Sequence, residues 1–435
     1  MVYYLLMHFL GTKELPKRSQ SLVQKFVILI FLIDIAFSIS STFYVLFVID
    51  AMGYEKLGIL IGVGFFVQAL LDYPSGTLGD WIGQKWILFF AYLGFGLSYA
   101  LLFFAQTYND FLLVYIVSAI AASQQSGAFG TWFENNYKVS VEDKDPERET
   151  FKFFTGRQTS LGNLTVGFSF VIGGLIATLY FREVVFAIQA IFLTILAFIL
   201  LFSVKNFPEI PKPEISVRNY FYLFFEGIWV VLTNKVLLIF IIGFILTQTM
   251  WMIWASLILF PLYIGYTGSD IGASLFRAGI FSIGIIIPII GANIAKKSSI
   301  KRLPFFRAIH STIFFVGFMI ITYFYPIDKN EFQIIPLFLS SIILTIPWIL
   351  LQVAVIIESR IFLDLIPDRN RNSVYSLIPT LVLLFNTPTV MIGGILLEDF
   401  GINATLFVLV VIGLISSLIF TLPIYLLQKD EKWTH

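Results

Sequence analysis

The chain of 435 residues contains no cysteine and little charge for its length. Without cysteine it can form no disulfide, no thiolate metal site and no thiol nucleophile. Only 13% of its residues are charged, whereas 58% are hydrophobic. Because soluble domains usually carry about 25% charged residues, this sequence lacks the polar surface that a soluble protein needs.

Histidine and catalytic motifs are also scarce. His8 and His435 lie near the two ends of the sequence, and His310 stands by itself within an apolar run. No phosphate-binding loop and no nucleophile elbow occurs. We therefore expect no cofactor, no metal site, no nucleic-acid binding and no enzymatic activity.

Long apolar runs are what the sequence has in abundance. Each is long enough to cross a hydrocarbon core of about 30 Å as a helix. The runs are continuous rather than alternating with a period of two, which favours helices over barrel strands. The expected fold class is an all-α integral membrane protein with twelve transmembrane helices, at residues 24–49, 57–79, 86–106, 111–133, 158–180, 184–203, 236–264, 269–295, 304–325, 332–357, 372–397 and 402–428.

The distribution of Lys and Arg predicts the orientation of these spans, because cytoplasmic loops are enriched in both residues. With both termini on the cytoplasmic side, 24 of the 28 basic residues fall in cytoplasmic segments. The outer loops keep Lys56, Arg182 and Lys329, and Arg277 falls inside a span. We expect a multi-pass protein of the plasma membrane that works as a monomer in the lipid bilayer.

The spans divide into two halves of six. Residues 204–235 contain several prolines, which indicate a linker, followed by an amphipathic stretch that predicts a helix at the inner interface. The predicted bundles are residues 1–203 and 236–435. "VIGGLIA" at 171–177 recurs as "MIGGILL" at 391–397, and "AMGY" at 51–54 resembles "YIGY" at 263–266. Two pseudo-symmetric bundles around a central site are typical of alternating-access transporters.

The stretch "SGTLGDWIGQKW" at residues 75–86 lies between the second and third spans. It resembles the hallmark loop of the major facilitator superfamily, G-x-x-x-D-R/K-x-G-R/K-R/K, through Gly76, Asp80, Gly83 and Lys85. The lead-in "DYPSG", which begins at Asp72, resembles the acid-x-Pro-x-Gly sequence common in that superfamily. Two of the usual basic positions are occupied by Trp81 and Gln84 instead.

The residue types of this loop have physical reasons. Gly76 allows two helices to approach closely, and Gly83 permits a tight reversal with positive φ. Asp80 can accept hydrogen bonds from a helix N-terminus or pair with a cation. The resemblance implies that Asp80 holds the inner side shut in the outward-facing state. The second half has Ala295 at the corresponding position, so we expect a one-sided latch.

Asp34 lies about nine residues into the first span, close to the middle of the bilayer, where a carboxylate is costly unless it faces a cavity or is protonated. Ser38 and Ser41 follow at i+4 and i+7, on the same face of a continuous helix. Gln248 and Trp251 occupy a similar depth in the seventh span. We interpret these residues as the lining of a shared cavity and Asp34 as a proton-coupling or cation-binding carboxylate; the alternative is a structural carboxylate.

Other polar residues within the spans allow two interpretations. Arg277 can pair with Asp34 or an anionic solute, or extend outward to the membrane surface. Asn163 and Gln352 can line the cavity or join neighbouring helices. The charged run "DKDPERE" at 143–149 is expected to be a solvated loop.

Glu134 and Glu358 end the fourth and tenth spans, 224 positions apart, and are plausible equivalents in the two halves. With Arg157, Arg360 and Asp80 they are expected to form charge pairs of a cytoplasmic gate. The gating role is favoured over solute binding because both acids lie near the membrane face.

The function that these features predict is secondary transport of a small solute by alternating access, without ATP. The stretch from Ser126 to Arg157 resembles the drug-exporter-like members of the superfamily, which favours export. Apart from one acid and one base within the spans, the expected lining is apolar and aromatic, which favours an amphipathic compound, and Asp34 favours coupling to protons. "GFSFVIGG" at 167–174 departs from the Gly-Pro-x-x-Gly-Gly of those exporters, since Ser169 and Phe170 replace Gly-Pro. Proton-coupled uptake of a sugar or organic anion is the alternative, and a non-transporting receptor or enzyme is a remote one.

Overall fold

The computed structural model describes residues 7–210, 217–327, 331–366 and 371–427. Within these ranges the regular structure is helical and contains no β-strand. Eleven of the described helical segments are long and apolar enough to cross a membrane. The last of them, Leu377–Leu426, is interrupted at Gly401, where φ is 76° and ψ is −179°. The described helices therefore provide twelve spans, and the predicted all-α membrane fold is confirmed.

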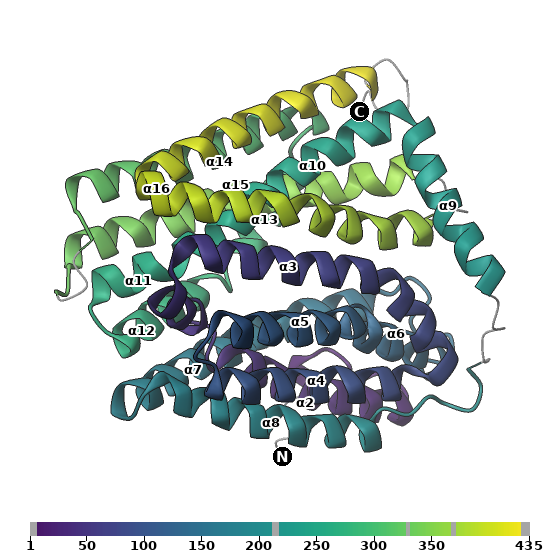
Figure 1. Cartoon of the computed structure of the whole chain (residues 1–435). Coiled ribbons are helices and arrows are strands. Elements are labelled where there is room, and N and C mark those ends of the chain that lie inside the picture. The colour runs from purple at the N-terminus through teal and green to yellow at the C-terminus, as the bar shows by residue number, and fades with distance from the viewer. Residues whose placement is uncertain (1–6, 211–216, 328–330, 367–370, 428–435) are drawn as a thin grey trace. The chain divides into compact units, whose positions relative to one another are not determined.

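Figure 1 shows the helices in their order along the chain. Several spans consist of more than one helical segment. The segments are α2 (Lys17–Ser38), α3 (Tyr44–Ile82), α4 (Gln84–Phe104), α5 (Tyr108–Gln125), α6 (Ala128–Ser140), α7 (Glu149–Leu179), α8 (Arg182–Ser203), α9 (Val217–Thr233), α10 (Lys235–Ile253), a π-helical turn (Trp254–Ile258), α11 (Leu259–Thr267), α12 (Asp270–Ile283), α13 (Ile287–Lys296), a 3₁₀ turn (Ile300–Arg302), α14 (Leu303–Phe324), α15 (Ile334–Leu365) and α16 (Arg371–Leu427).

The chain forms two compact units. Unit 1 comprises Met1–Thr42 and Leu70–Ile215, and unit 2 comprises Phe43–Ala69 and Ser216–His435. The long helix α3 therefore contributes its first part to unit 2 and its second part to unit 1. The sequence placed all of this helix in the N-terminal bundle, and the division into bundles 1–203 and 236–435 stays a prediction.

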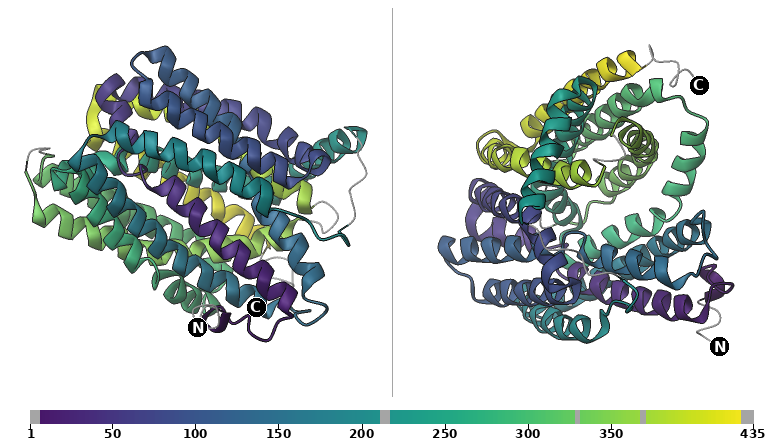
Figure 2. Two further views of the ribbon diagram at one scale, coloured as in Figure 1. Left: turned by 90° about the horizontal axis from the view of Figure 1, so that it is seen from below. Right: turned by 90° about the vertical axis from the view of Figure 1, so that its right-hand side faces the viewer.

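Aliphatic and aromatic residues share the core of unit 1, to which α2, α4, α6, α7 and α8 contribute (Figure 2). The Phe26 ring from α2 stacks on that of Phe133 from α6 with centroids 3.8 Å apart. Phe154 from α7 meets Phe26 edge-on, and all three side chains are buried. Such ring pairs add specific geometry to the burial of apolar surface.

Unit 2 has a second aromatic core between α10, α15 and α16. The Phe240 ring packs edge-on against Phe362 at 4.7 Å and against Phe420 at 5.1 Å. The linker helix α9 contacts α10 and α16, with Val231 buried and Trp229 exposed. Trp is enriched where a protein meets the membrane interface, so the exposed Trp229 is compatible with the interfacial helix that the sequence predicts.

The first span is interrupted in the structure, whereas the sequence predicted a continuous helix over residues 24–49. Helix α2 ends at Ser38, and α3 begins at Tyr44. Side chains compensate the backbone at the break, since Ser41 Oγ donates to the Ser38 carbonyl oxygen at 2.9 Å and Gln189 Nε2 donates to that of Ala36 at 2.7 Å. Consecutive hydroxyl residues favour such local hydrogen bonds over helix continuation.

The seventh span is also irregular. A π-helical turn at Trp254–Ile258 separates α10 from α11. The Trp254 ring is buried and lies 4.6 Å from that of Phe318. The distance between the "AMGY" and "YIGY" motifs shows which positions of the two halves correspond. The position in the seventh span that corresponds to the break in the first span lies within a few residues of this turn.

The two recurring glycine pairs pack against these irregular points. In unit 1, a methyl group on Gly173 of α7 would collide with the Ile39 carbonyl group in the break. In unit 2, a methyl group on Gly393 of α16 would lie 3.1 Å from Ile253 and 3.3 Å from Leu257, at the π-helical turn. The glycines thus allow one helix to approach an irregular stretch of another, which is the use of small residues in membrane helix packing.

One expectation about the loops is wrong. The run at 143–149 is not wholly solvated, because Asp145 is buried and accepts a hydrogen bond from the Tyr137 hydroxyl at 2.8 Å. The backbone N–H groups of Thr150 and Phe151, at the start of α7, donate to the same carboxylate. Burial acts to raise the pKa of Asp145, but these hydrogen bonds outweigh it and hold the pKa below its usual value.

The contact between Gly173 and the break generates a stability prediction. We expect Gly173→Ala to lower the free energy of unfolding by about 1–3 kcal/mol, because the methyl group has no space beside backbone atoms. Gly156→Ala on the same helix is the matched control, since a methyl group there meets nothing. Melting temperatures of both variants in detergent test the prediction, and equal temperatures contradict it.

Candidate functional site

Asp34 lies in unit 1 against helix α7. Its Oδ2 atom is 3.1 Å from the position that a methyl group on Gly162 would occupy, and Gln158 Nε2 is 3.7 Å from the same point. The absence of a side chain at Gly162 therefore leaves room for the carboxylate. No described residue forms a hydrogen bond or ion pair with Asp34. The carboxylate is half-buried and available to a proton, a cation or a solute.

A tyrosine and a glutamine complete this polar cluster. Gln125 Nε2 of α5 donates to the Tyr92 hydroxyl of α4 at 3.0 Å. The Tyr92 hydroxyl lies within electrostatic range of Asp34, and Phe37 covers the Tyr92 ring edge-on at 5.7 Å. Sequence reasoning missed both Tyr92 and Gln158. The spacing of four between Gln158 and Gly162, which puts them on one helix face, was the available signal.

The remaining predicted residues of unit 1 lie beside this cluster. Ser38 is buried at the end of α2, and Ser41 lies in the break that follows. The predicted stripe of Asp34, Ser38 and Ser41 on one continuous helix face is therefore wrong. Asn163 is half-buried on α7, next to Gly162.

Unit 2 contains a cavity of about 440 Å³ between α10, α14, α15 and α16. Gln248 and Trp251 both line it. The cavity shared with Asp34 that the sequence suggested stays a prediction. The other lining residues come from four helices and are mainly apolar or aromatic: Phe244, Arg307, Leu351, Val355, Glu358, Ser359, Phe362, Tyr375, Ile378 and Pro379.

A buried ion pair forms one part of this lining. Arg307 Nε of α14 donates to Glu358 Oε1 of α15 at 2.7 Å, and Arg307 Nη2 donates to Glu358 Oε2. Their exposed fractions are 4% and 2%. The sequence placed Glu358 at the membrane face, in a gate with Arg360. Arg360 instead lies 4.0 Å from the exposed Asp364, one turn along α15.

Three side chains in this region carry nitrogen atoms that lack hydrogen-bond partners among the described residues. The atoms are Arg307 Nη1, both ring nitrogens of His310 and Trp251 Nε1. The His310 ring stacks on Trp251 with centroids 4.9 Å apart, one turn along α14 from Arg307. Sequence reasoning counted Arg307 with the basic residues of a loop and left His310 without a role. Their spacing of three on one helix was the signal.

Two predicted residues of unit 2 lie elsewhere. The Arg277 guanidinium lies over the Phe260 ring at 4.7 Å and over the Phe281 ring at 5.6 Å. Aromatic faces stabilise a cation in this way. Gln352 packs its Cβ atom close to Gly291 of α13 and is absent from the residues that line the described cavity.

The hallmark loop is described only in part. Gly83 has a φ of 88°, the positive value expected for the reversal before α4. The Lys85 ammonium lies 5.4 Å from the Trp86 ring. Asp72 is half-buried near the end of the second span. Gly76 and Asp80 belong to α3, but the Asp80 side chain and the surroundings of Gly76 lie outside the described part of the structure, so the latch stays a prediction.

The charge pairs of unit 1 differ from those expected. Glu134 accepts a hydrogen bond from Arg148 at 2.9 Å and lies 3.3 Å from the Lys138 ammonium. Arg157 does not pair with Glu134. Its guanidinium lies over the Phe153 ring at 3.9 Å and donates to the backbone carbonyl of Phe9. The paired side chains are 43–52% exposed, so each pair contributes little to stability.

Within unit 2, the first part of α3 makes a close contact with α16, which we call the glycine seam. A methyl group on Gly58 would lie 3.0 Å from the Gly394 Cα atom. One turn later, a methyl group on Gly62 would lie 2.9 Å from the Thr387 carbonyl oxygen. At the end of the seam, Glu398 Oε2 accepts a hydrogen bond from the Tyr54 backbone N–H at 2.8 Å.

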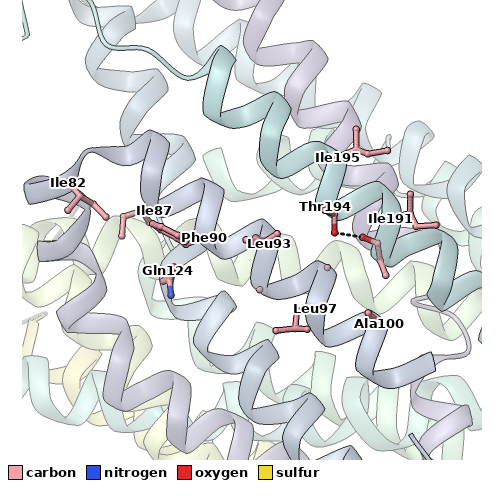
Figure 3. Close-up of a pocket in the computed structure, with 13 residues that line it drawn as sticks. Ile82, Ile87, Phe90, Leu93, Leu97, Ala100, Gln124, Ile191, Thr194 and Ile195 are labelled. Atoms are coloured by element: carbon pink, nitrogen blue, oxygen red, sulfur yellow. Dashed lines mark hydrogen bonds between the residues drawn. The ribbon is translucent and has the colours of Figure 1, made fainter. Parts of the chain in front are cut away.

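A larger groove in unit 1, of about 860 Å³, lies between α4 and α8 (Figure 3). Its lining is apolar apart from Gln124 and Thr194, and Thr194 Oγ1 donates to the Ala190 carbonyl. Leu97 and Ile191 are more than half exposed. Exposed apolar side chains on membrane-spanning helices face lipid, so the chemistry of this groove fits acyl chains rather than a specific solute.

The comparisons with known proteins identify the family. The sequence matches the Major Facilitator Superfamily over residues 26–359, which is more than half of the chain. The chain belongs to the major facilitator superfamily. It is therefore a multi-pass membrane transporter and not an enzyme. A comparison with curated proteins gave no match.

Solved transporter structures share the fold at low sequence identity. The nucleoside transporter NupG is 14% identical, with a TM-score of 0.67 and coverage of 94% of this chain and 99% of that one. The POT family transporter PepTSo is 11% identical, with a TM-score of 0.72 and coverage of 96% and 100%. A bacterial homologue of the human lysosomal transporter Spinster, inward-facing and unoccupied, is 13% identical, with a TM-score of 0.66 and coverage of 94% and 97%.

The glycine seam generates a prediction about local dynamics. Helix α3 is interrupted at Gly53, where φ is 80° and ψ is 174°, so Tyr54 is the first residue of its second segment. Glu398→Gln removes the negative charge that the Tyr54 N–H group and the positive end of this segment bind. We expect amide hydrogen exchange over residues 54–60 to become about five- to tenfold faster, equivalent to roughly 1 kcal/mol. Asp399→Asn, at the neighbouring exposed carboxylate, is the control and should leave exchange unchanged. Equal exchange in both variants contradicts a capping role for Glu398.

Proposed function

We propose that this transporter exports a small amphipathic solute by alternating access and uses a proton gradient to do so. It works in the plasma membrane with both termini in the cytoplasm, as the distribution of Lys and Arg favours. The proton site is Asp34 in unit 1, and the solute contacts the cavity of unit 2.

The proposal depends on the surroundings of the Asp34 carboxylate. The carboxylate lies about mid-span, within a polar cluster, and no described residue satisfies it with a hydrogen bond or a positive charge. Helix α2 ends one turn later, at Ser38. The C-terminal end of a helix carries about half a negative charge. A carboxylate beside such an end forms a negative site inside the membrane, which attracts a proton or another cation.

The chemistry of the unit 2 cavity supports an amphipathic solute. Aromatic and aliphatic side chains form most of its lining, and Gln248 is the only amide among the described residues that line it. A highly hydroxylated sugar requires more amide and hydroxyl groups to replace its hydrogen bonds with water. This argument favours an amphipathic compound over a sugar.

One feature of the sequence supports export, and one feature of the backbone supports the gate. The stretch from Ser126 to Arg157 resembles that of drug-exporter-like members, which supports the direction. The backbone at Gly83 has the geometry that the hallmark loop requires. We include Asp80 as the inner latch on the basis of that resemblance, with Glu134 and Arg157 as charges of the same face.

Uptake of an organic anion is the second candidate. It is favoured by Arg307, a buried cation in the cavity lining whose Nη1 atom has no described partner. Uptake and export differ in the side of the membrane from which the transporter takes the solute, so a measurement of the direction of transport separates them.

The role of Asp34 can be tested in proteoliposomes that contain a pH-sensitive dye. We expect at least one of ethidium, benzenesulfonate and phenylalanine, as an amphipathic cation, anion and zwitterion, to move protons when added to the wild type. Asp34→Asn should reduce this proton movement at least about tenfold, because an amide cannot carry the proton.

Asp364→Asn, at an exposed carboxylate of α15, is the matched control and should retain wild-type proton movement. The proposal is overturned if none of the three solutes moves protons in the wild type. Proton coupling through Asp34 is excluded if Asp34→Asn behaves like the control.

A further inference from the structure

The unit 2 cavity contains one full positive and one full negative charge. Among the described residues that line it, Arg307 and Glu358 alone are charged. Both are more than nine-tenths buried, and they bind each other in a bidentate pair. The net charge of the lining is therefore zero, although the two charges present a strong local dipole.

Each member of the pair retains capacity for another partner. Arg307 uses Nε and Nη2 to bind Glu358, and its Nη1 atom is buried without a partner among the described residues. A guanidinium offers five N–H donors in a plane. Each carboxylate oxygen of Glu358 accepts one bond from Arg307 and has a further lone pair available. The pair can thus hold a carboxylate beside Arg307 and an ammonium group beside Glu358.

The rest of the lining is suited to an apolar group. Phe244, Trp251 and Phe362 supply aromatic surface, and Leu351 and Ile378 supply aliphatic surface. The volume of about 440 Å³ lies at the small end of the range for ligand cavities. The Trp251 ring is held in place by stacking on His310 and by the edge-on contact with Phe314.

Electrostatics separates the possible classes of solute. An anion without a positive group leaves the cavity with net negative charge, and a cation without a negative group leaves it with net positive charge. Inside a membrane protein such an unbalanced charge is costly. A zwitterion keeps the net charge at zero and can align its dipole against that of Arg307 and Glu358.

We propose that the cavity beside the Arg307–Glu358 pair binds an amphipathic zwitterion, with its carboxylate on Arg307, its ammonium group on Glu358 and its apolar side group against Trp251 and Phe244. The proposal rests on the proposed transport function and names the solute class that it moves. It also assigns Glu358 to solute binding rather than to a cytoplasmic gate.

A series of three solutes with one phenyl ring tests the charge requirement. L-phenylalanine is the zwitterion, 2-phenylethylamine lacks the carboxylate and 3-phenylpropanoate lacks the ammonium group. Dissociation constants of the purified full-length transporter at pH 7 are measured by calorimetry. We expect phenylalanine to bind at least about tenfold more tightly than either of the other two.

Variants of Arg307 and Glu358 should change which of the three solutes binds most tightly. If the pair had only a structural role, this preference would stay the same. With Glu358→Gln the lining becomes positive, and 3-phenylpropanoate should bind most tightly. With Arg307→Gln the lining becomes negative, and 2-phenylethylamine should bind most tightly. Because each single variant leaves a buried charge unpaired and can fail to fold, the neutral double variant Arg307→Gln/Glu358→Gln is included, and it should lose the preference among the three solutes.

Arg360→Gln is the control, since Arg360 lies on the same helix and is exposed, and it should bind like the wild type. The proposal is overturned if the cation or the anion binds the wild type as tightly as phenylalanine does, or if no solute binds below about 10 mM. It is also overturned if the folded double variant keeps the wild-type preference. These binding outcomes are independent of proton movement in vesicles, so failure here leaves the Asp34 experiment to decide the transport function.

Discussion

A backbone that crosses a membrane has no water with which to form hydrogen bonds, so every interruption of a helix must be satisfied by the protein itself. This constraint explains much of the structure. The first span is broken after Ser38, and the carbonyl groups of Ser38 and Ala36 accept hydrogen bonds from Ser41 and Gln189. Gly173 allows α7 to cover the break. The break in the first span is therefore tightly packed, and it lies beside the polar cluster of Asp34.

The same reasoning applies to the charged side chains inside unit 2. A lone guanidinium or carboxylate in this position would be costly, whereas the bidentate pair of Arg307 and Glu358 satisfies most of the polar atoms of both. The remaining donor, Arg307 Nη1, belongs to a residue that lines the cavity. Structural and functional needs coincide here, because the ion pair that neutralises the cavity is also its most specific chemical feature.

Much of the fold could be predicted from the sequence because the membrane imposes simple rules. The lengths of the spans and the reversal at Gly83 each depend on a few consecutive residues. The break after Ser38 could not be predicted, since a Ser- and Thr-rich stretch is compatible with a polar helix face. Whether it ends the helix depends on Gly173 and Gln189, which are more than 130 residues away.

The candidate site shows the same limit. Asp34, Gln248 and Trp251 could be proposed from the sequence because polar and amphipathic residues stand out within apolar spans. Arg307 follows a basic run and was counted with it, although its partner lies 51 residues further along the chain. The packing of the helices decides which of several nearby charges form a pair. The spacing of residues within one segment does not predict this pairing. Asp145 was missed for the same reason, since its partners belong to two different helices.

Helix α3 belongs to unit 2 before residue 70 and to unit 1 after it. Pro74 lies within the second part of this helix. Because proline has no backbone N–H, the carbonyl group of Leu70 loses the helical hydrogen bond that residue 74 would otherwise donate. A helix bends most readily where such a bond is missing, so any bending of α3 is expected near the residue at which it passes from one unit to the other.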